Sequence, residues 1–420
     1  MKNKFRSLMF LCLIFTLQLF SAAPTVKPGI DVLRERDFDI LQGKRVGLIT
    51  NATGVTSDLQ STIDVLFNSH GVKLVALFSP EHGVRGDADA GKEINGYNDS
   101  RTGLPVYSLY GRTRRPTKDM LRGIDVLVYD IQDIGVRSYT FISTMGLAMG
   151  AAAENGIKFV VLDRPNPLTG ERIEGAMLEP KFKSFIGEYP IPYVYGMTIG
   201  ELAQMINGEQ WLNNRGSSNT ADKCDLTVVM MKGWKRSMWW DETGLAWVPT
   251  SPHIPHSFTT IFAVLTGLLG ELGTANQGVG YTLPFELVGA PWIDGYALAR
   301  YLNNLNMPGV HFRPISYIPF YKDTTGIRYK GVQIHIIDRT ILNITQVQIA
   351  ILEALLYLFP DNNIFDRAKP EKINAFDKAV GTDDLRRALQ NKTSVEEILH
   401  RIDLLRAQFM IKREKYLLYK

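Results

Sequence analysis

The chain has 420 residues, and since one domain typically has about 150, two domains are expected. Its 45% hydrophobic and 21% charged residues are ordinary for a globular protein and exclude collagen-like, coiled-coil, disordered and disulfide-rich classes. The formal net charge is +4, but three of the 47 cationic residues lie in the first six positions. Without these three, 44 cations face 43 anions, so the composition gives no support for nucleic-acid binding.

Residues 1–23 have the pattern of a secretory signal peptide. The cations of positions 1–6 precede an apolar run over 8–20, and the small residues 21–23 provide a cleavage site. The apolar run is shorter than the roughly 20 residues that a membrane-spanning helix needs, although an uncleaved anchor remains the alternative. We therefore predict export to the periplasm, with no stable membrane insertion after cleavage. Only Cys224 would remain, so no internal disulfide is expected.

Short runs of β-branched and apolar residues alternate with helical patterns in the first half of the chain. Such runs are typical of strands buried on both faces of a parallel sheet that helices cover. The predicted strands are 45–50, 73–78, 106–110, 125–129, 158–162 and 225–231. The predicted helices between them are 63–66, 116–122, 138–155 and 198–207. This order indicates an α/β domain, which we place at 24–250.

The pattern changes after a Trp-rich and Pro-rich stretch at 234–255. Helices are predicted at 261–272 and 296–305, strands at 315–320 and 332–337, and helices from there to the end. This order predicts a smaller α+β domain at 251–420.

Polar residues follow several of the predicted strands. Because ligands bind at the carboxyl ends of the strands of an open parallel sheet, these residues could meet in one cleft with several carboxylates. The alternative is that each one only caps a helix or holds a loop. The residues are Asn51, Glu81, His82, Asp130, Asp133, Asp163 and Arg164.

Familiar cofactor and nucleophile motifs are absent from the sequence. There is no Gly-rich dinucleotide fingerprint after a strand, no Walker A motif, no serine-hydrolase elbow and no HExxH motif. The seven His residues have no metal-ligand spacing, so neither a cofactor nor a metal is expected. Carboxylates remain as catalysts, which favours acid-assisted cleavage of a glycosidic bond. Aromatic residues such as Tyr139 and Tyr195 could pack against sugar faces.

The sequence also contains five longer motifs, 79–83 (SPEHG), 130–140 (DIQDIGVRSYT), 163–167 (DRPNP), 196–202 (GMTIGEL) and 284–292 (PFELVGAPW). Together and in this order they resemble the NamZ family of exo-β-N-acetylmuramidases. The resemblance runs from about residue 29 to about residue 337, and more loosely to the end of the chain. It implies a Rossmann-like N-terminal domain and a smaller C-terminal domain, with the active site between them.

The resemblance also implies an activity, the release of terminal, non-reducing, β-1,4-linked N-acetylmuramic acid from peptidoglycan fragments. Matched to the family motif, Glu81 is the main catalytic carboxylate, and we interpret it as the general acid. The second catalytic group stays open between Asp130, Asp133, Glu174 and the acetamido group of the substrate itself.

Nine residues are predicted to bind the saccharide. They are Asn51, His82, Arg137, Tyr139, Asp163, Arg164, Asn166, Glu174 and Tyr195. We expect Arg137 and Arg164 to hold the lactyl carboxylate of muramic acid, because the guanidinium fork matches a carboxylate in two parallel hydrogen bonds. The alternative is that either arginine pairs with an aspartate of the strand ends and holds the loops.

Three segments differ from the usual family motifs. Val194-Tyr195 stands where Arg-His is usual, residues 276–282 read NQGVGYT in place of a segment containing SEGRGT, and His253 replaces an Asn. Two of these changes remove cations that could meet the lactyl carboxylate. Two other functions are weighed against the glycosidase, namely a non-catalytic cell-wall saccharide-binding protein on the same scaffold and a nucleotide-dependent α/β enzyme. The absence of a phosphate-binding loop motif argues against the nucleotide-dependent enzyme.

Overall fold

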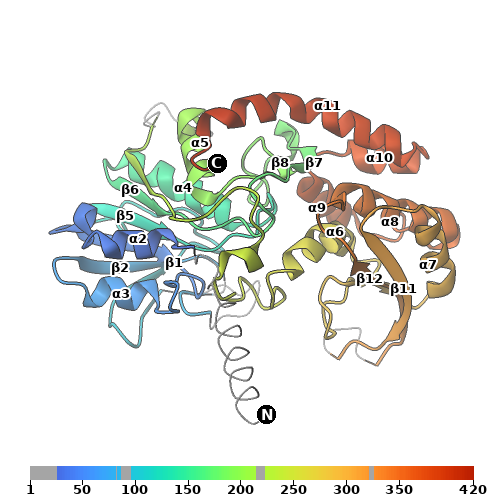
Figure 1. Cartoon of the computed structure of the whole chain (residues 1–420), viewed down its shortest axis with the longest axis horizontal. Coiled ribbons are helices and arrows are strands. Elements are labelled where there is room, and N and C mark those ends of the chain that lie inside the picture. Colours follow the sequence, from blue (N-terminus) through green and yellow to red (C-terminus); the bar gives the residue numbers. More distant parts are fainter. Residues whose placement is uncertain (1–25, 82, 87–95, 214–222, 321–325) are drawn as a thin grey trace, which may run out of the picture.

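The computed structural model describes residues 26–81, 83–86, 96–213, 223–320 and 326–420. The predicted signal peptide, 1–23, lies outside these residues. Two bodies stand side by side, an N-terminal α/β domain and a smaller C-terminal domain (Figure 1). Among the described residues, no helix is long and apolar enough to span a membrane.

The N-terminal domain contains a seven-stranded sheet in the order β3-β4-β2-β1-β5-β6-β9. All neighbours are parallel except the short edge pair β3–β4. The strands are β1 (Arg45–Thr50), β2 (Lys73–Ser79), β3 (Tyr97–Asn98), β4 (Pro105–Ser108), β5 (Val126–Asp130), β6 (Lys158–Leu162) and β9 (Leu226–Val229). Without β3, this is the Rossmann order, with its topological switch between β1 and β5. The predicted fold class is confirmed.

Successive residues of each central strand enter opposite cores, as the two-residue repeat of a strand requires. In β5, Val126 and Val128 pack with helices α2 (Gly29–Glu35) and α3 (Thr62–Asn68), whereas Leu127 and Tyr129 pack with α4 and α5 on the other face. Helices α4 (Phe141–Glu154) and α5 (Ile199–Gly208) are buried over most of their length. The continuous apolar strands are explained by this two-sided burial.

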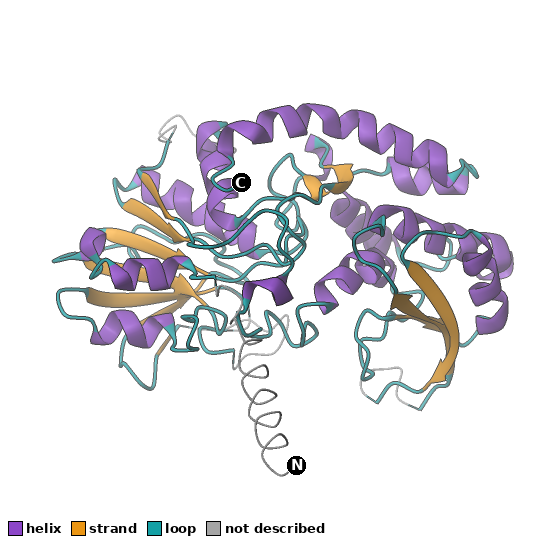
Figure 2. Ribbon diagram, in the orientation of Figure 1, coloured by secondary structure: helices purple, strands orange, loops and turns teal. Residues whose placement is uncertain are grey.

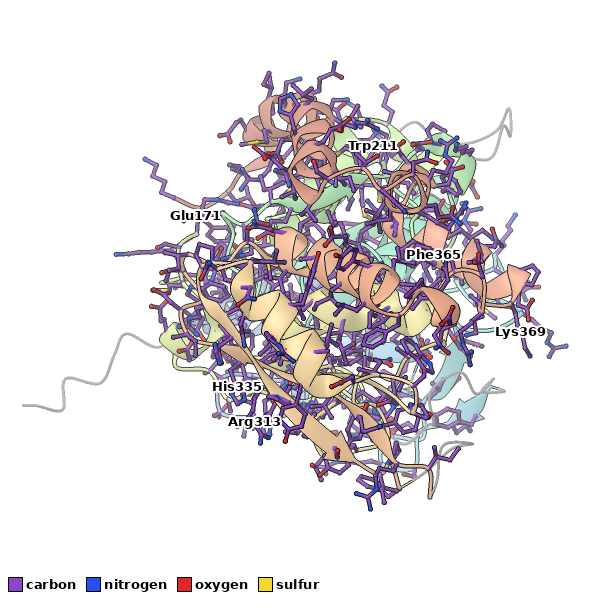
Figure 3. All side chains as sticks on the ribbon, turned by 90° about the vertical axis from the view of Figure 1, so that its right-hand side faces the viewer. Glu171, Trp211, Arg313, His335, Phe365 and Lys369 are labelled. Carbon is purple, nitrogen blue, oxygen red and sulfur yellow. The ribbon has the colours of Figure 1, made fainter. Side chains whose placement is uncertain are left out.

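The C-terminal domain packs helices against a three-stranded antiparallel sheet of order β10-β12-β11 (Figure 2). Its elements are α6 (Thr259–Leu272), β10 (Leu287–Ala290), α7 (Gly295–Asn304), β11 (Val310–Tyr317), β12 (Tyr329–Ile336), α8 (Ile344–Leu358), α9 (Pro370–Val380) and α10 (Asp384–Gln390). Figure 3 looks onto this domain, with Arg313 and His335 on neighbouring strands and Lys369 immediately before α9. The small hairpin β7 (Glu174–Met177) and β8 (Pro192–Val194) lies between the two bodies.

The last helix, α11 (Val395–Arg413), crosses back over both domains, so the chain ends on the N-terminal one (Figure 1). Arg413 donates to the carbonyl oxygens of Gly170 and Gly196, and the Tyr419 hydroxyl donates to Asp163 at 2.6 Å. The closing residues, which we assigned to the C-terminal domain, therefore pack on the other one.

One predicted helix is wrong. Residues 116–122 form turns: the α-helical bond from the Leu121 amide to the Thr117 carbonyl, at 3.1 Å, is followed by bonds of the tighter i→i−3 type, such as Arg122 to Asp119 at 3.3 Å. Gly123, with a φ of 80°, ends the segment. The six strands predicted for the N-terminal domain and the two predicted for the C-terminal domain are present, with shifts of a few residues at their ends. Strand β10 and the hairpin β7–β8 were not predicted, since all three strands are short and each contains Gly or Pro.

Candidate active site

Glu81 lies just past the carboxyl end of β2, beside a hollow of about 360 Å³. This volume is within the range of small-molecule sites, roughly 300–1,000 Å³. Pro80 precedes Glu81, and Gly83 adopts a φ of 79°, a left-handed conformation that lets the chain turn away. The hollow is lined by Glu81, Tyr110, Arg114, Ser138, Tyr139, Thr140, Phe141, Ser184, Phe185, Ile186 and Lys378. We call it the Glu81 pocket.

Two tyrosines border Glu81 in this pocket. The Tyr110 phenol hydrogen-bonds the Glu81 carboxylate, and its pKa is raised first by burial and then by that charge. Burial also raises the pKa of Tyr139, with smaller contributions from the charges of Asp133 and Glu81. The Tyr139 hydroxyl donates to Thr250 Oγ1 at 2.9 Å. Both phenols therefore stay neutral and offer ring faces beside a single carboxylate.

Both domains contribute to the Glu81 pocket. Glu81, Tyr110 and Arg114 come from loops after β2 and β4, whereas Lys378 lies in the last turn of α9. The guanidinium of Arg114 stacks over the Phe185 ring, 4.5 Å from its centre. A saccharide in this pocket would thus touch the two bodies at once.

Asp130 and Arg164, by contrast, form a buried ion pair at the ends of β5 and β6. Two parallel hydrogen bonds of 2.6 and 2.9 Å join the guanidinium to the carboxylate, and the two side chains are 4% and 0% exposed. Arg164 also donates to the Val55 carbonyl, and Thr62 donates to Asp130. The predicted substrate contact of Arg164 thus gives way to the alternative, a pair that holds the loops. Asp130 does not line the Glu81 pocket.

Asp133 is a buried carboxyl group outside the lining of the Glu81 pocket. Burial raises its pKa to about 7, against hydrogen bonds from Tyr195, Gly135 and Ile134 that lower it. The Tyr195 hydroxyl and the Gly135 amide both donate to Oδ2, while Oδ1 has no partner among the described residues. Tyr195 is 1% exposed, so it positions Asp133 and leaves no ring face for a sugar.

Arg137 is a correction to the sequence-based prediction. Its side chain is fully buried and donates to four backbone carbonyls, those of Ala176, Ile191, Ala379 and Val380. Burial lowers its pKa to about 10. Both terminal nitrogens of the guanidinium are used in this way, while Nε has no partner among the described residues. Arg137 therefore joins the hairpin β7–β8 to the end of α9 and, being fully buried, does not line the Glu81 pocket.

The other predicted binding residues serve as local supports outside the Glu81 pocket. Asn51 accepts from the Thr53 amide at 2.9 Å, and Asn166 donates to the Met197 carbonyl at 2.9 Å. Asp163, with a pKa raised to about 6 by burial, accepts from the Gly200 amide at the start of α5. Glu174 accepts from Arg172 and from the Thr345 amide. His82 lies outside the described residues.

A much smaller cavity lies at the switch between β1 and β5. It has about 20 Å³, room for one water molecule and too little for a sugar. Its lining includes Thr53, Gln132 and Arg164 from the loops after the strands, together with Trp240 and Leu245 from the Trp-rich segment. The usual ligand position of a Rossmann-like sheet is therefore filled by protein. Groups of three or more metal-ligating side chains are also absent from the described residues.

Four lining segments were missed by the sequence analysis. Tyr110 and Arg114 follow β4, so the rule applied to the other strand ends would have found them. Residues 184–186 and Lys378 carry no local signal, because only the packing of α9 against the 179–187 segment brings them to Glu81.

Comparison with known proteins agrees with this architecture. A family model described as the N-terminal part of the exo-β-N-acetylmuramidase NamZ matches residues 46–258, and the C-terminal one matches residues 264–419. The two matched regions adjoin between residues 258 and 264, beyond the domain boundary that we predicted after residue 250. A peptidoglycan β-N-acetylmuramidase NamZ of Bacillus subtilis (strain 168) is 45% identical over 396 residues, which cover 94% of this chain and 92% of that protein.

Two solved structures are also similar. Both are DUF1343 family proteins of Bacteroides fragilis NCTC 9343. One has 49% sequence identity and a TM-score of 0.88, and the other has 30% and 0.72. Each match covers 94% of this chain and 99% of the other.

Proposed function

This chain belongs to the NamZ family of exo-β-N-acetylmuramidases, and we propose that it releases N-acetylmuramic acid from the non-reducing ends of peptidoglycan fragments in the Glu81 pocket. It is a glycosidase, and its substrates are peptidoglycan-derived saccharides. None of the comparisons supports the non-catalytic alternative. The position of Glu81 carries the proposal, because acid-assisted glycoside cleavage needs a carboxylic acid that can reach the leaving oxygen, and Glu81 lies beside two tyrosines in a pocket of small-molecule size.

Glu81 acts as the general acid. It donates its proton to the glycosidic oxygen, so the C1–O bond breaks and the remaining saccharide leaves as an alcohol. Water then supplies hydroxide to C1, and its other proton returns to Glu81. The Tyr110 phenol hydrogen-bonds the Glu81 carboxyl group and so orients the group that carries this proton.

The acetamido group of the substrate serves as the second catalytic group. Asp130 and Asp133 are buried, and Glu174 is bonded to Arg172 and the Thr345 amide, so none of these three candidates lines the pocket. Among its described lining residues, Glu81 is the only carboxylate. Attack of the acetamido oxygen on C1, followed by attack of water, inverts C1 twice. Proton NMR of freshly released product should therefore show the β anomer, and an initial α anomer would contradict this step.

The function itself is tested with purified protein and the disaccharide N-acetylmuramyl-β-1,4-N-acetylglucosamine. We expect equimolar release of the two sugars. The matched control is a longer glycan whose non-reducing end is N-acetylglucosamine, from which no sugar should be released. Cleavage inside that glycan, or no cleavage of the disaccharide, would contradict the proposal.

The enzyme works in the periplasm, where such fragments arise. The support is the pattern of residues 1–23, with its cations, apolar run and small residues. Intact-mass measurement of protein recovered from the periplasm should match a chain beginning at Pro24. A mass that corresponds to all 420 residues would contradict export with cleavage.

A further inference from the structure

We propose that Lys378 and Arg114 form the specificity site of this enzyme, which binds the lactyl carboxylate of the terminal N-acetylmuramic acid. The inference rests on the proposed function and replaces the contacts that we expected from Arg137 and Arg164.

The charge of the Glu81 pocket supports this assignment. Its described lining contains two cations, Lys378 and Arg114, and one carboxylate, Glu81. N-acetylmuramic acid differs from N-acetylglucosamine by the lactyl ether and its carboxylate alone. A pocket for a neutral sugar needs no excess of cations. Here a ligand with one carboxylate, together with Glu81, would balance the charges of the two cations.

Lys378 is available for a ligand. Other lysines of this region form ion pairs within the protein, Lys181 with Asp383 at 2.9 Å and Lys183 with Glu188 at 3.2 Å. Within the described part of the chain, Lys378 forms no ion pair, although its side chain is partly buried at the pocket. A partly buried ammonium group without a protein anion gains from an anionic ligand.

Arg114 is held at the other side of the same pocket. Its guanidinium stacks on the Phe185 ring and is close enough to Tyr110 to lower the pKa of that phenol, against the larger effects that raise it. Stacking fixes the plane of the fork while its edge remains able to receive a carboxylate. Tyr110 in turn touches Glu81, so this cation lies one residue away from the acid.

Arg137 is a positioning residue for Lys378. It bonds the carbonyls of Ala379 and Val380, which directly follow Lys378 at the end of α9. Gly381 has a φ of 89°, and a Cβ there would lie 2.5 Å from Arg137 Nη2. The buried guanidinium and the glycine therefore fix the last turn of α9, and with it the origin of the Lys378 side chain.

The test is calorimetric binding of N-acetylmuramic acid and of N-acetylglucosamine to the full chain. Wild-type protein should prefer the muramic acid. Lys378→Met should weaken muramic acid binding about tenfold or more, the usual value of one charge-assisted hydrogen bond, and glucosamine binding by a smaller factor. Arg114→Met should act in the same direction, and Lys378→Arg should restore part of the preference.

Lys372→Met is the matched control, because Lys372 is an exposed lysine of the same helix outside the pocket. It should leave both affinities unchanged. Equal losses for the two sugars in Lys378→Met and Arg114→Met, or a wild type without preference, would overturn the inference.

The two proposals fail differently in this design. If the wild type prefers muramic acid but does not cleave the disaccharide, the proposed function is wrong and the specificity site stands. If it cleaves the disaccharide while Lys378→Met and Arg114→Met keep the wild-type ratio of kcat/KM for a chromogenic muraminide and glucosaminide, the specificity site is wrong.

Discussion

The ends of the central strands β1, β5 and β6 differ from the ends of β2 and β4, although each is an apolar strand followed by polar residues. At the centre, Asp130 and Arg164 are paired and buried, and only about 20 Å³ remains free. At the flank, Glu81 borders a pocket of about 360 Å³. The same sequence pattern thus gives a structural support in one place and the proposed general acid in the other. Position in the sheet and cover by other segments decide between them.

The largest expected effect on stability comes from breaking the central pair. Arg164→Met leaves Asp130 buried without its partner, so the free energy of unfolding should fall by about 3–5 kcal/mol in urea titrations. Arg45→Met is the matched control, because Arg45 pairs with Asp125 on the surface and is 51% exposed. Its cost should stay below about 1 kcal/mol. Equal costs for the two variants would remove the contrast between the buried centre and the surface.

A smaller effect concerns the buried carboxyl of Asp133. Its pKa of about 7 in the folded protein lies above the ordinary 3.8, so folding favours the protonated form. That stabilisation is complete below about pH 4 and is lost as the pH rises through about 7. Asp133→Asn keeps an acceptor for Tyr195 and Gly135 and should gain on the order of 3 kcal/mol relative to wild type across this range.

Measuring unfolding of both proteins at several pH values isolates this group, since the raised pKa of Asp163 contributes equally to both. Parallel pH profiles of wild type and Asp133→Asn would contradict the assignment.

The smallest effect is expected at Tyr139, which borders the Glu81 pocket but also bonds Thr250. Tyr139→Phe keeps the ring and loses the neutral hydrogen bonds of the hydroxyl with Thr250 and Ser251, so stability should fall by about 1–2 kcal/mol. Steady-state kinetics should show less than about a tenfold loss in kcat/KM. A loss as large as that of a Glu81 variant would make Tyr139 part of the chemistry.

The fold was predictable where burial leaves a repeating pattern. Strands such as β5 lie between two cores, so every position is apolar and the run is visible in the sequence. The segment 116–122 has a helical composition but is too short between Pro116 and Gly123 to form more than turns. The hairpin β7–β8 has no such pattern, because its pairing is short and irregular.

The site was predictable only in part. Glu81, predicted from its motif and its place after a strand, lines the pocket, as does Tyr139, and their roles there stay predictions. Arg137 was misjudged, because a sequence does not show that four backbone carbonyls of two domains will meet one guanidinium. Lys378 was not predicted, because its helix α9 reaches the pocket only through tertiary packing, which the local sequence does not show.

The most direct test of the account compares Glu81→Gln with Asp130→Asn in two assays, disaccharide hydrolysis and urea unfolding. Glu81→Gln should lower kcat by about 10²- to 10⁴-fold and change the free energy of unfolding by less than about 0.5 kcal/mol. Asp130→Asn should lower that free energy by about 3–5 kcal/mol, because Arg164 loses its partner, while the folded fraction retains kcat within about tenfold. A Glu81→Gln enzyme with wild-type kcat, or an Asp130→Asn enzyme that is stable and inactive, would contradict the account.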